Sequence, residues 1–88
     1  MILYIGSDHV IQQPSIDFRR DTLSVTTDSA VAAEHACKRN AAGIINAYRF
    51  DPESALQNDI IIKEDSVAFC SDTALEALKF MGASFVHQ

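Results

Sequence analysis

The chain has 88 residues and a mass of 9.7 kDa, which fits one domain, residues 1–88, around one hydrophobic core. Hydrophobic residues make up 48% of it and charged residues 22%, a composition that excludes a disordered chain. Seven basic and twelve acidic side chains give a net charge of −5, which argues against nucleic-acid binding. No apolar run approaches the ~18 residues that cross a membrane, and two cysteines make no disulfide framework, so we expect a cytoplasmic protein.

The first half of the chain predicts two strands and a helix. Ile2–Ile5 is a short apolar run that Gly6 closes, and Leu23–Thr26 alternates with β-branched residues, so both are expected to be strands. A helix is expected from Ser29 to about Asn40, after residues that favour a helix cap. Its predicted buried face consists of small side chains, which would let the helix approach a sheet closely: Ala30, Ala33, Ala36 and Cys37.

The second half predicts three strands, a second helix and a final strand. The strands are expected at Ile44–Phe50, at Asp59–Lys63, which has the apolar content of a central strand, and at Val67–Phe69. A helix is expected to begin at Ser71 and to be stopped by Gly82, with Thr73 and Glu76 as a capping box and an apolar stripe of Ala74, Leu75, Leu78 and Met81. Ser84–His87 is expected to add the last strand.

This order, with more strands than helices and no regular alternation, predicts the fold class. We expect a single small α+β domain with a mixed or mainly antiparallel sheet of about five or six strands and two helices.

The side chains that usually carry chemistry are scattered. His9, His35 and His87 have no ligand spacing, and no metal or cofactor is expected. Cys70 precedes a predicted helix, a position that lowers a thiol pKa, but we interpret both Cys37 and Cys70 as structural thiols.

Four segments, in this order, resemble a family of small bacterial ADP-ribosyltransferase-like proteins. The family begins with a Leu-Tyr-His-Gly-Ser motif, which Leu3–Ser7 matches except at its third position. Its second motif is a strand ending in Thr-Thr-Asp before an Ala-rich helix, and Leu23–Lys38 is similar. Ile45–Asp51 resembles the next strand, and Ser66–Phe80 the last motif, a Gln- or Glu-bearing strand followed by a short helix.

The resemblance implies an ancestral transfer of ADP-ribose from NAD, with a histidine, a tyrosine and an acidic or amide residue at three positions. Here Ile5, Ser24 and Ser66 occupy them, and none can replace the donor, the aromatic ring or the carboxylate. The family's middle segment is also shortened between Leu56 and Asp59. We therefore expect a pseudoenzyme. His9 and Asp65 are the neighbours that would stand in if activity survived.

The resulting prediction is a non-catalytic acidic module that binds or inhibits a larger protein with a basic surface, a profile shared by inhibitors that phages or mobile elements encode. The candidate binding residues are acidic and close to predicted turns: Asp51, Glu53, Glu64 and Asp65. The alternative is a residual NAD-dependent ADP-ribosyltransferase or NAD glycohydrolase with rearranged residues. A homodimer that pairs strand edges through Ile60–Ile62 or Phe85–Val86 is the third prediction.

Overall fold

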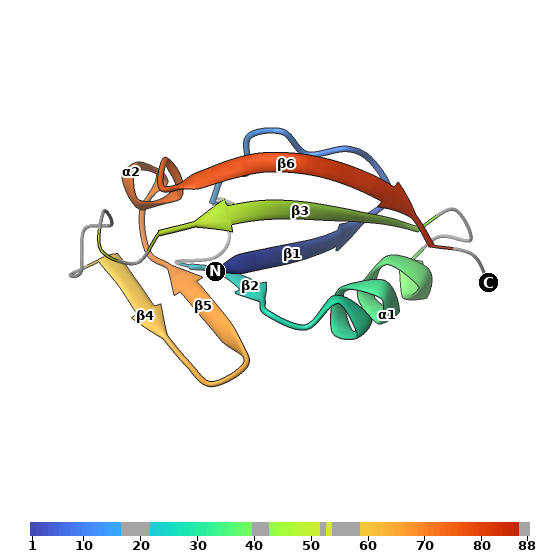
Figure 1. Cartoon of the computed structure of the whole chain (residues 1–88), viewed down its shortest axis with the longest axis horizontal. Helices are drawn as coiled ribbons and strands as arrows, with labels where there is room; N and C mark the ends of the chain where they lie inside the picture. Colours follow the sequence, from blue (N-terminus) through green and yellow to red (C-terminus); the bar gives the residue numbers. More distant parts are fainter. Residues whose placement is uncertain (17–21, 40–42, 52, 54–58, 87–88) are drawn as a thin grey trace.

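The computed structural model describes residues 1–16, 22–39, 43–51, 53 and 59–86, and these form six strands and two helices (Figure 1). In chain order they are β1 (Ile2–Ser7), β2 (Leu23–Thr26), α1 (Ser29–Arg39), β3 (Ile44–Phe50), β4 (Ile60–Ile62), β5 (Ser66–Phe69), α2 (Asp72–Leu75) and β6 (Leu78–Phe85). The α+β class and the order of the elements are confirmed. The turn or single helical turn expected at Asp51–Ser54 lies partly outside the described residues, and His87 lies outside them.

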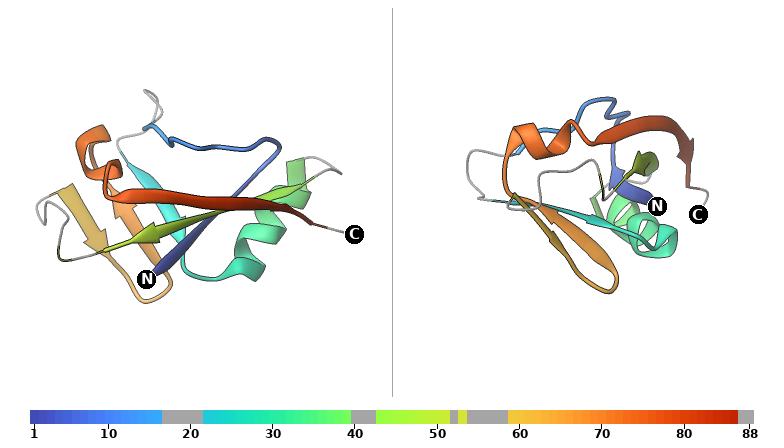
Figure 2. Two further views of the ribbon diagram at one scale, coloured as in Figure 1. Left: turned by 45° about the horizontal axis from the view of Figure 1, so that its top comes forward. Right: turned by 60° about the vertical axis from the view of Figure 1, so that its left-hand side comes forward.

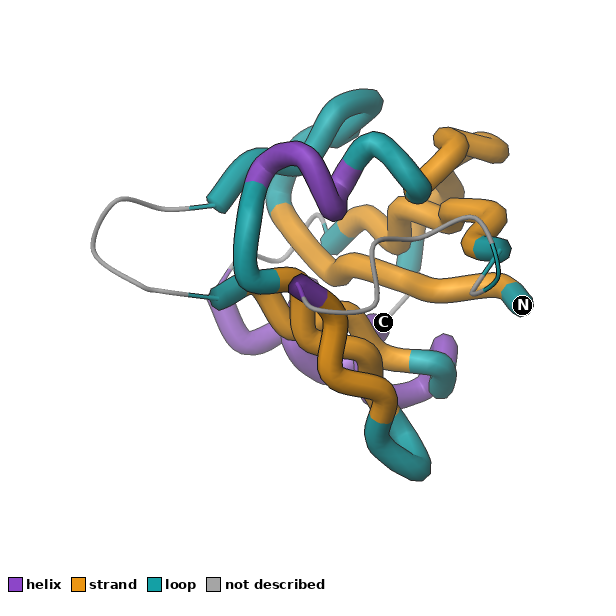
Figure 3. Tube along the Cα trace, turned by 90° about the vertical axis from the view of Figure 1, so that its left-hand side faces the viewer, coloured by secondary structure: helices purple, strands orange, loops and turns teal. Residues whose placement is uncertain are grey.

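All six strands belong to one sheet in the order β4-β5-β2-β1-β3-β6, and every pairing is antiparallel. β1 pairs with β3 along its whole length, but it meets β2 at a single register pair, Tyr4 with Thr26. The sheet therefore divides into two halves at the β1–β2 contact. Figures 2 and 3 show the β4–β5 hairpin turned away from β1, β3 and β6.

The hydrophobic core lies on one face of this sheet, called the inner face below. Its largest members come from both halves of the sheet, and each is almost completely buried: Leu3, Val25, Tyr48, Phe50, Val67 and Phe69. Phe50 and Phe69 meet edge to face across the two halves, with ring centroids 5.4 Å apart. Ala74 and Leu75 of α2 and Leu78 of β6 complete the cluster. The segment after β1 runs toward α2 (Figure 2), where Ile16 packs against the core and its N–H donates to Asp72 Oδ1 at 2.9 Å.

Helix α1 packs on the opposite, outer face. The expected small-residue contact exists, because a Cβ on Gly6 would lie 1.9 Å from the carbonyl oxygen of Ala32. Ala36 is buried as predicted, but the buried partner one turn earlier is Ala32. Ala30, which was expected on this face, is exposed. The predicted face was therefore wrong at its first turn, since the helix presents the 32–36 row to the sheet.

The second helix is much shorter than predicted. α2 ends at Leu75, and the residues from Leu78 onward, expected to be helical through Met81, belong to strand β6. The reason is the pairing with β3, in which Leu78 lies opposite Phe50 and Phe80 opposite Tyr48. The final strand is accordingly longer than the predicted one and starts at Leu78 instead of Ser84.

The isoleucine run also differs from the prediction. Ile60–Ile62 forms β4, but β4 is an edge strand and not a central one. Ile61 and Ile62 are about half exposed, at 51% and 55%. A continuous apolar run is typical of a strand that is buried on both faces, and here only Ile60 packs against the core.

Candidate functional site

The turn between β4 and β5 is an acidic surface that carries Glu64 and Asp65. Both side chains are exposed. The Asp65 carbonyl accepts a hydrogen bond from the Thr27 N–H at 3.0 Å and another from the Thr26 hydroxyl at 3.2 Å. The Lys63 N–H donates to the Ser66 carbonyl at 2.8 Å and closes the turn. These bonds hold the backbone of the turn against Thr26 and Thr27, the residues before α1. The two exposed carboxylates therefore extend from a hydrogen-bonded backbone.

The other predicted acidic pair, Asp51 and Glu53, follows β3. Both residues are exposed, and Asp51 Oδ1 accepts a hydrogen bond from the Glu53 N–H at 3.0 Å. The pair follows β3, whereas Glu64 and Asp65 lie between β4 and β5, and Figure 1 shows the end of β3 apart from the β4–β5 turn. The four predicted acidic residues thus form two separate sites. Within the described ranges, no three His, Cys, Asp or Glu side chains gather closely enough to hold a metal ion.

The three positions assigned by the resemblance do not share one face. Ser66 lies opposite Thr26, which itself lies opposite Tyr4, so Ser66 belongs to the outer face. Ser24 is two residues from Thr26 on the same strand and faces the same way. Ile5 instead packs against the core on the inner face. The sheet itself therefore separates Ile5 from Ser24 and Ser66.

The substitute residues considered for an enzyme do not assemble a site either. Asp65 lies in the β4–β5 turn, whereas His9 lies just after the C-terminal end of β1. There, the Nδ1 atom of His9 is 2.6 Å from Asp8 Oδ1. Ser7 is close by, but its hydroxyl donates to the backbone carbonyl of His9 and not to the imidazole ring. A nucleophilic serine needs its proton to pass to the base, so Ser7, Asp8 and His9 do not form a catalytic triad.

The cysteines and the remaining described histidine lie apart from these groups. Cys37 and Cys70 are free thiols, each partly buried, on α1 and before α2. His35 is exposed on α1. In the described part of the chain, therefore, no histidine is hydrogen-bonded to either thiol and could act as its general base.

Sequence reasoning missed a polar cluster under the segment after β1. Asn46 is completely buried, and its Oδ1 accepts from the Ile11 N–H at 2.9 Å. Its Nδ2 donates to the carbonyl of Ile5 at 3.2 Å, to Ser7 Oγ at 3.0 Å and to the carbonyl of His9 at 3.3 Å. Tyr48 donates to the Ile11 carbonyl, and burial raises its pKa to about 12. The alternation of side chains along β3 could have predicted this burial, because it places Asn46 on the same face as the buried apolar residues of the strand.

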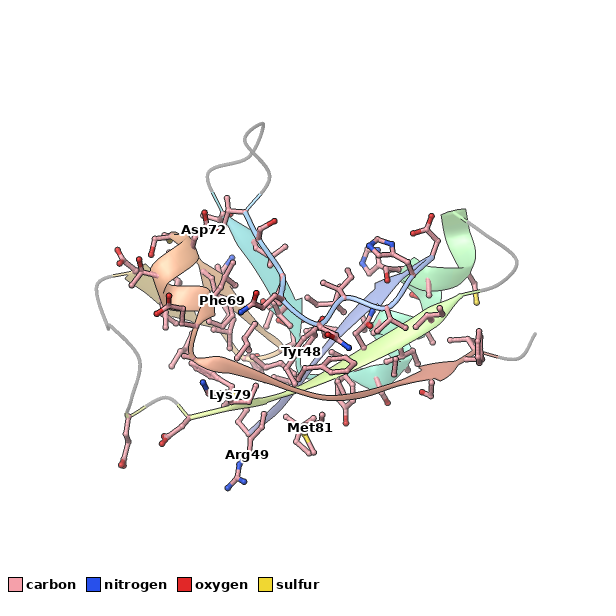
Figure 4. The ribbon with its side chains drawn as sticks, turned by 90° about the horizontal axis from the view of Figure 1, so that it is seen from above. Tyr48, Arg49, Phe69, Asp72, Lys79 and Met81 are labelled. Atoms are coloured by element: carbon pink, nitrogen blue, oxygen red, sulfur yellow. The ribbon has the colours of Figure 1, made fainter. Side chains whose placement is uncertain are left out.

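A groove of about 710 Å³ lies between residues 12–15, α2 and the start of β6. Asp72, Glu76 and Lys79 are its charged lining residues (Figure 4 labels Asp72 and Lys79). One oxygen of Asp72 already accepts the Ile16 N–H. With the two carboxylates of Asp72 and Glu76 against the one ammonium group of Lys79, the charged side chains of the lining have a net charge of −1.

Comparison with family models, with curated proteins and with solved structures finds no significant match. Neither helix among the described residues has the length and apolar content needed to cross a membrane.

Proposed function

We propose that this chain is a non-catalytic, acidic protein-binding or inhibitory module that acts in the cytoplasm on a larger protein with a basic surface. The observation that carries the proposal is the β4–β5 turn, which presents Glu64 and Asp65 to solvent from a hydrogen-bonded backbone. A binding surface that is ordered before association loses less conformational entropy on binding. Carboxylates on such a surface attract a basic partner and accelerate the encounter.

Two further observations support the proposal. The net charge of −5 extends the attraction beyond the turn, at distances up to a Debye length of about 8–10 Å at ordinary salt. The thiols of Cys37 and Cys70 are free, which fits a reducing compartment such as the cytoplasm. The acidic pair Asp51 and Glu53 is proposed as a second, peripheral contact.

The residual-enzyme alternative has no geometric support of this kind. Ile5 lies on the inner face while Ser24 and Ser66 lie on the outer face, so a single NAD cleft would not contain all three. Calorimetry with NAD separates the two functions. The binding-module proposal expects no heat of binding, whereas saturable binding, or protection from thermal unfolding by NAD, would favour the ADP-ribosyltransferase or NAD glycohydrolase alternative.

The test of the proposal uses a charge reversal in the turn, Glu64→Lys with Asp65→Lys. Proteins retained from a cell lysate by the wild type at low salt are identified, and the affinity of the purified partner is then measured. We expect a basic partner whose affinity falls about tenfold or more in the double variant and also falls at high salt.

The matched control is Glu34→Lys with Glu76→Lys, which makes the same change in net charge at two exposed carboxylates elsewhere on the surface. Its affinity is expected to stay within about threefold of the wild type, since only long-range attraction changes. An equal loss in both double variants, or the lack of any salt-sensitive partner, would contradict the turn as the binding site.

A further inference from the structure

Two of the chain's seven basic side chains lie on neighbouring strands of the outer face, although the net charge of the chain is −5. Arg49 of β3 and Lys79 of β6 are direct register partners, so their Cβ atoms leave the sheet on the same side, and Lys79 also lines the end of the groove that holds Asp72 and Glu76. Ile2 of β1 is the register partner of Arg49 on its other side. Ile2, Arg49 and Lys79 therefore form a row across three neighbouring strands.

Met81 extends this row along β6. A register shift between Ala47 and Tyr48 makes Met81 the extra residue of a β-bulge, and its side chain is 56% exposed. Figure 4 shows Arg49 and Met81 on the side of the strands that faces away from Tyr48 and the core. The four residues Ile2, Arg49, Lys79 and Met81 are called the outer patch below. Each of them is exposed.

Helix α1 leaves the outer patch uncovered. The helix contacts the sheet at Gly6, near the end of β1, and at Gly43 before β3. Ile2 lies four residues before Gly6, which is about 13 Å along a strand. Figure 1 shows α1 near the end of β1 opposite the N-terminus. This half of the outer face thus presents two apolar side chains, Ile2 and Met81, beside two positive charges.

The pairing of Arg49 with Lys79 is unfavourable in the isolated chain. Like charges directly opposite each other on antiparallel strands repel. In the described part of the chain, no hydrogen bond or ion pair engages either side chain. A carboxylate placed between them would remove the repulsion and bind the guanidinium through two parallel hydrogen bonds.

We infer that the outer patch binds an acidic segment of another protein chain, with carboxylates over Arg49 and Lys79 and an apolar side chain against Ile2 and Met81. Charge complementarity selects this occupant: the two cations require anions, and the flanking apolar side chains require more than a free anion. The inference is independent of the proposed function, because none of Asp51, Glu53, Glu64 and Asp65 belongs to the outer patch.

The test titrates the protein with a synthetic peptide of alternating glutamate and leucine and measures affinity by calorimetry. A peptide with glutamine in place of glutamate is the uncharged comparison. We expect the glutamate peptide to bind more tightly than the glutamine peptide, and Lys79→Glu to weaken its binding about tenfold or more. Lys63→Glu is the matched control, since it makes the same change in net charge at an exposed lysine of the β4–β5 turn, and it should leave the affinity within about twofold.

Thermal unfolding of the same variants separates a lost site from a lost fold. Lys79→Glu places opposite charges across the two strands, so its melting temperature should not fall below that of the wild type. Equal binding of the glutamate peptide by the wild type and Lys79→Glu would overturn the inference. So would a lack of binding, or complete competition by inorganic phosphate at the same concentration, which would indicate a small-anion site.

Discussion

Asn46 and Tyr48 show how single polar side chains fix the segment that follows β1. Both are fully buried on the inner face of β3, and both bond to Ile11. Asn46 satisfies one donor, the Ile11 N–H, and one acceptor, the His9 carbonyl, of this segment, which contains no helix or strand, and it also bonds to Ile5 and Ser7 of β1. A buried amide without partners would cost about 1–3 kcal/mol, so these bonds also select one arrangement of the segment.

The Tyr48 phenol predicts that the protein loses stability at high pH. Burial raises its pKa from 10.0 to about 12 in the folded protein, so between these values the unfolded chain releases the proton first. The stabilisation is fully present below pH 10 and is lost as the pH rises toward 12, because the folded state then binds more protons than the unfolded state. The slope attributable to one group is at most about 1.4 kcal/mol per pH unit.

Urea unfolding of the wild type and Tyr48→Phe across this range measures the effect. The variant lacks the ionisable group and should show a shallower decline in the free energy of unfolding, although its stability at neutral pH falls by about 1 kcal/mol with the lost hydrogen bond. Parallel declines in the two proteins would show that Tyr48 does not ionise on unfolding in this range.

For single residues, the sequence predicted exposure to solvent, but it did not predict which residues of other strands would lie beside them. Glu64 and Asp65 were expected at an exposed turn because carboxylates rarely tolerate burial, and the structure has them there. The pairing of Arg49 with Lys79 was not predicted. It depends on the register between β3 and β6, which the local pattern of neither strand contains.

At the scale of elements, β2 and β3 have the predicted bounds, Leu23–Thr26 and Ile44–Phe50. Alternating or β-branched residues specify such strands locally. The region after Ser71 was predicted to be helical because Leu75, Leu78 and Met81 fit a helical stripe, and this was wrong from Leu78 onward, where Leu78 and Phe80 lie on a strand face. Tertiary pairing with Phe50 and Tyr48 decided between helix and strand, and that information is not local.

The short helix α2 predicts a difference between two neighbouring hydroxyl residues. Its N-cap is Ser71, whose hydroxyl accepts the Ala74 N–H at 3.2 Å and donates to Asp59 Oδ2 at 3.1 Å. Thr73, which the sequence suggested as the cap, lies exposed inside the helix. Ser71→Ala should therefore destabilise the protein by about 1–2 kcal/mol, and Thr73→Ala by less than about 0.5 kcal/mol.

Chemical denaturation of both variants, analysed at a common denaturant slope, measures this difference. The hydroxyl of Ser71 also joins α2 to the residue before β4, so its loss removes a tertiary contact as well as a cap. Equal effects of the two substitutions, or a larger effect of Thr73→Ala, would show that the cap at Ser71 does not stabilise the folded state.

At the scale of the whole molecule, the sheet ends in two open edges that the sequence could not place. The local sequence of Ile60–Ile62 would be the same in a central strand, which pairs with two strands, and in an edge strand, which pairs with one. The strand order leaves β4 and β6 at the edges, with Ile61, Ile62 and Phe85 exposed on them. Short edge strands limit unwanted pairing, and β4 has only three residues, but its exposed isoleucines still favour association.

We expect two copies to associate through β4, with a twofold axis that pairs the two strands antiparallel and buries Ile61 and Ile62 of each copy. In sedimentation velocity, the apparent mass should rise with concentration from 9.7 kDa toward twice that value. Ile61→Lys should keep the protein monomeric, because a lysine on the edge opposes pairing. Phe85→Ser, which removes the exposed aromatic ring on β6, is the control and should leave the dimer intact. A monomer at every concentration, or a dimer that Phe85→Ser dissociates and Ile61→Lys does not, would exclude the β4 interface.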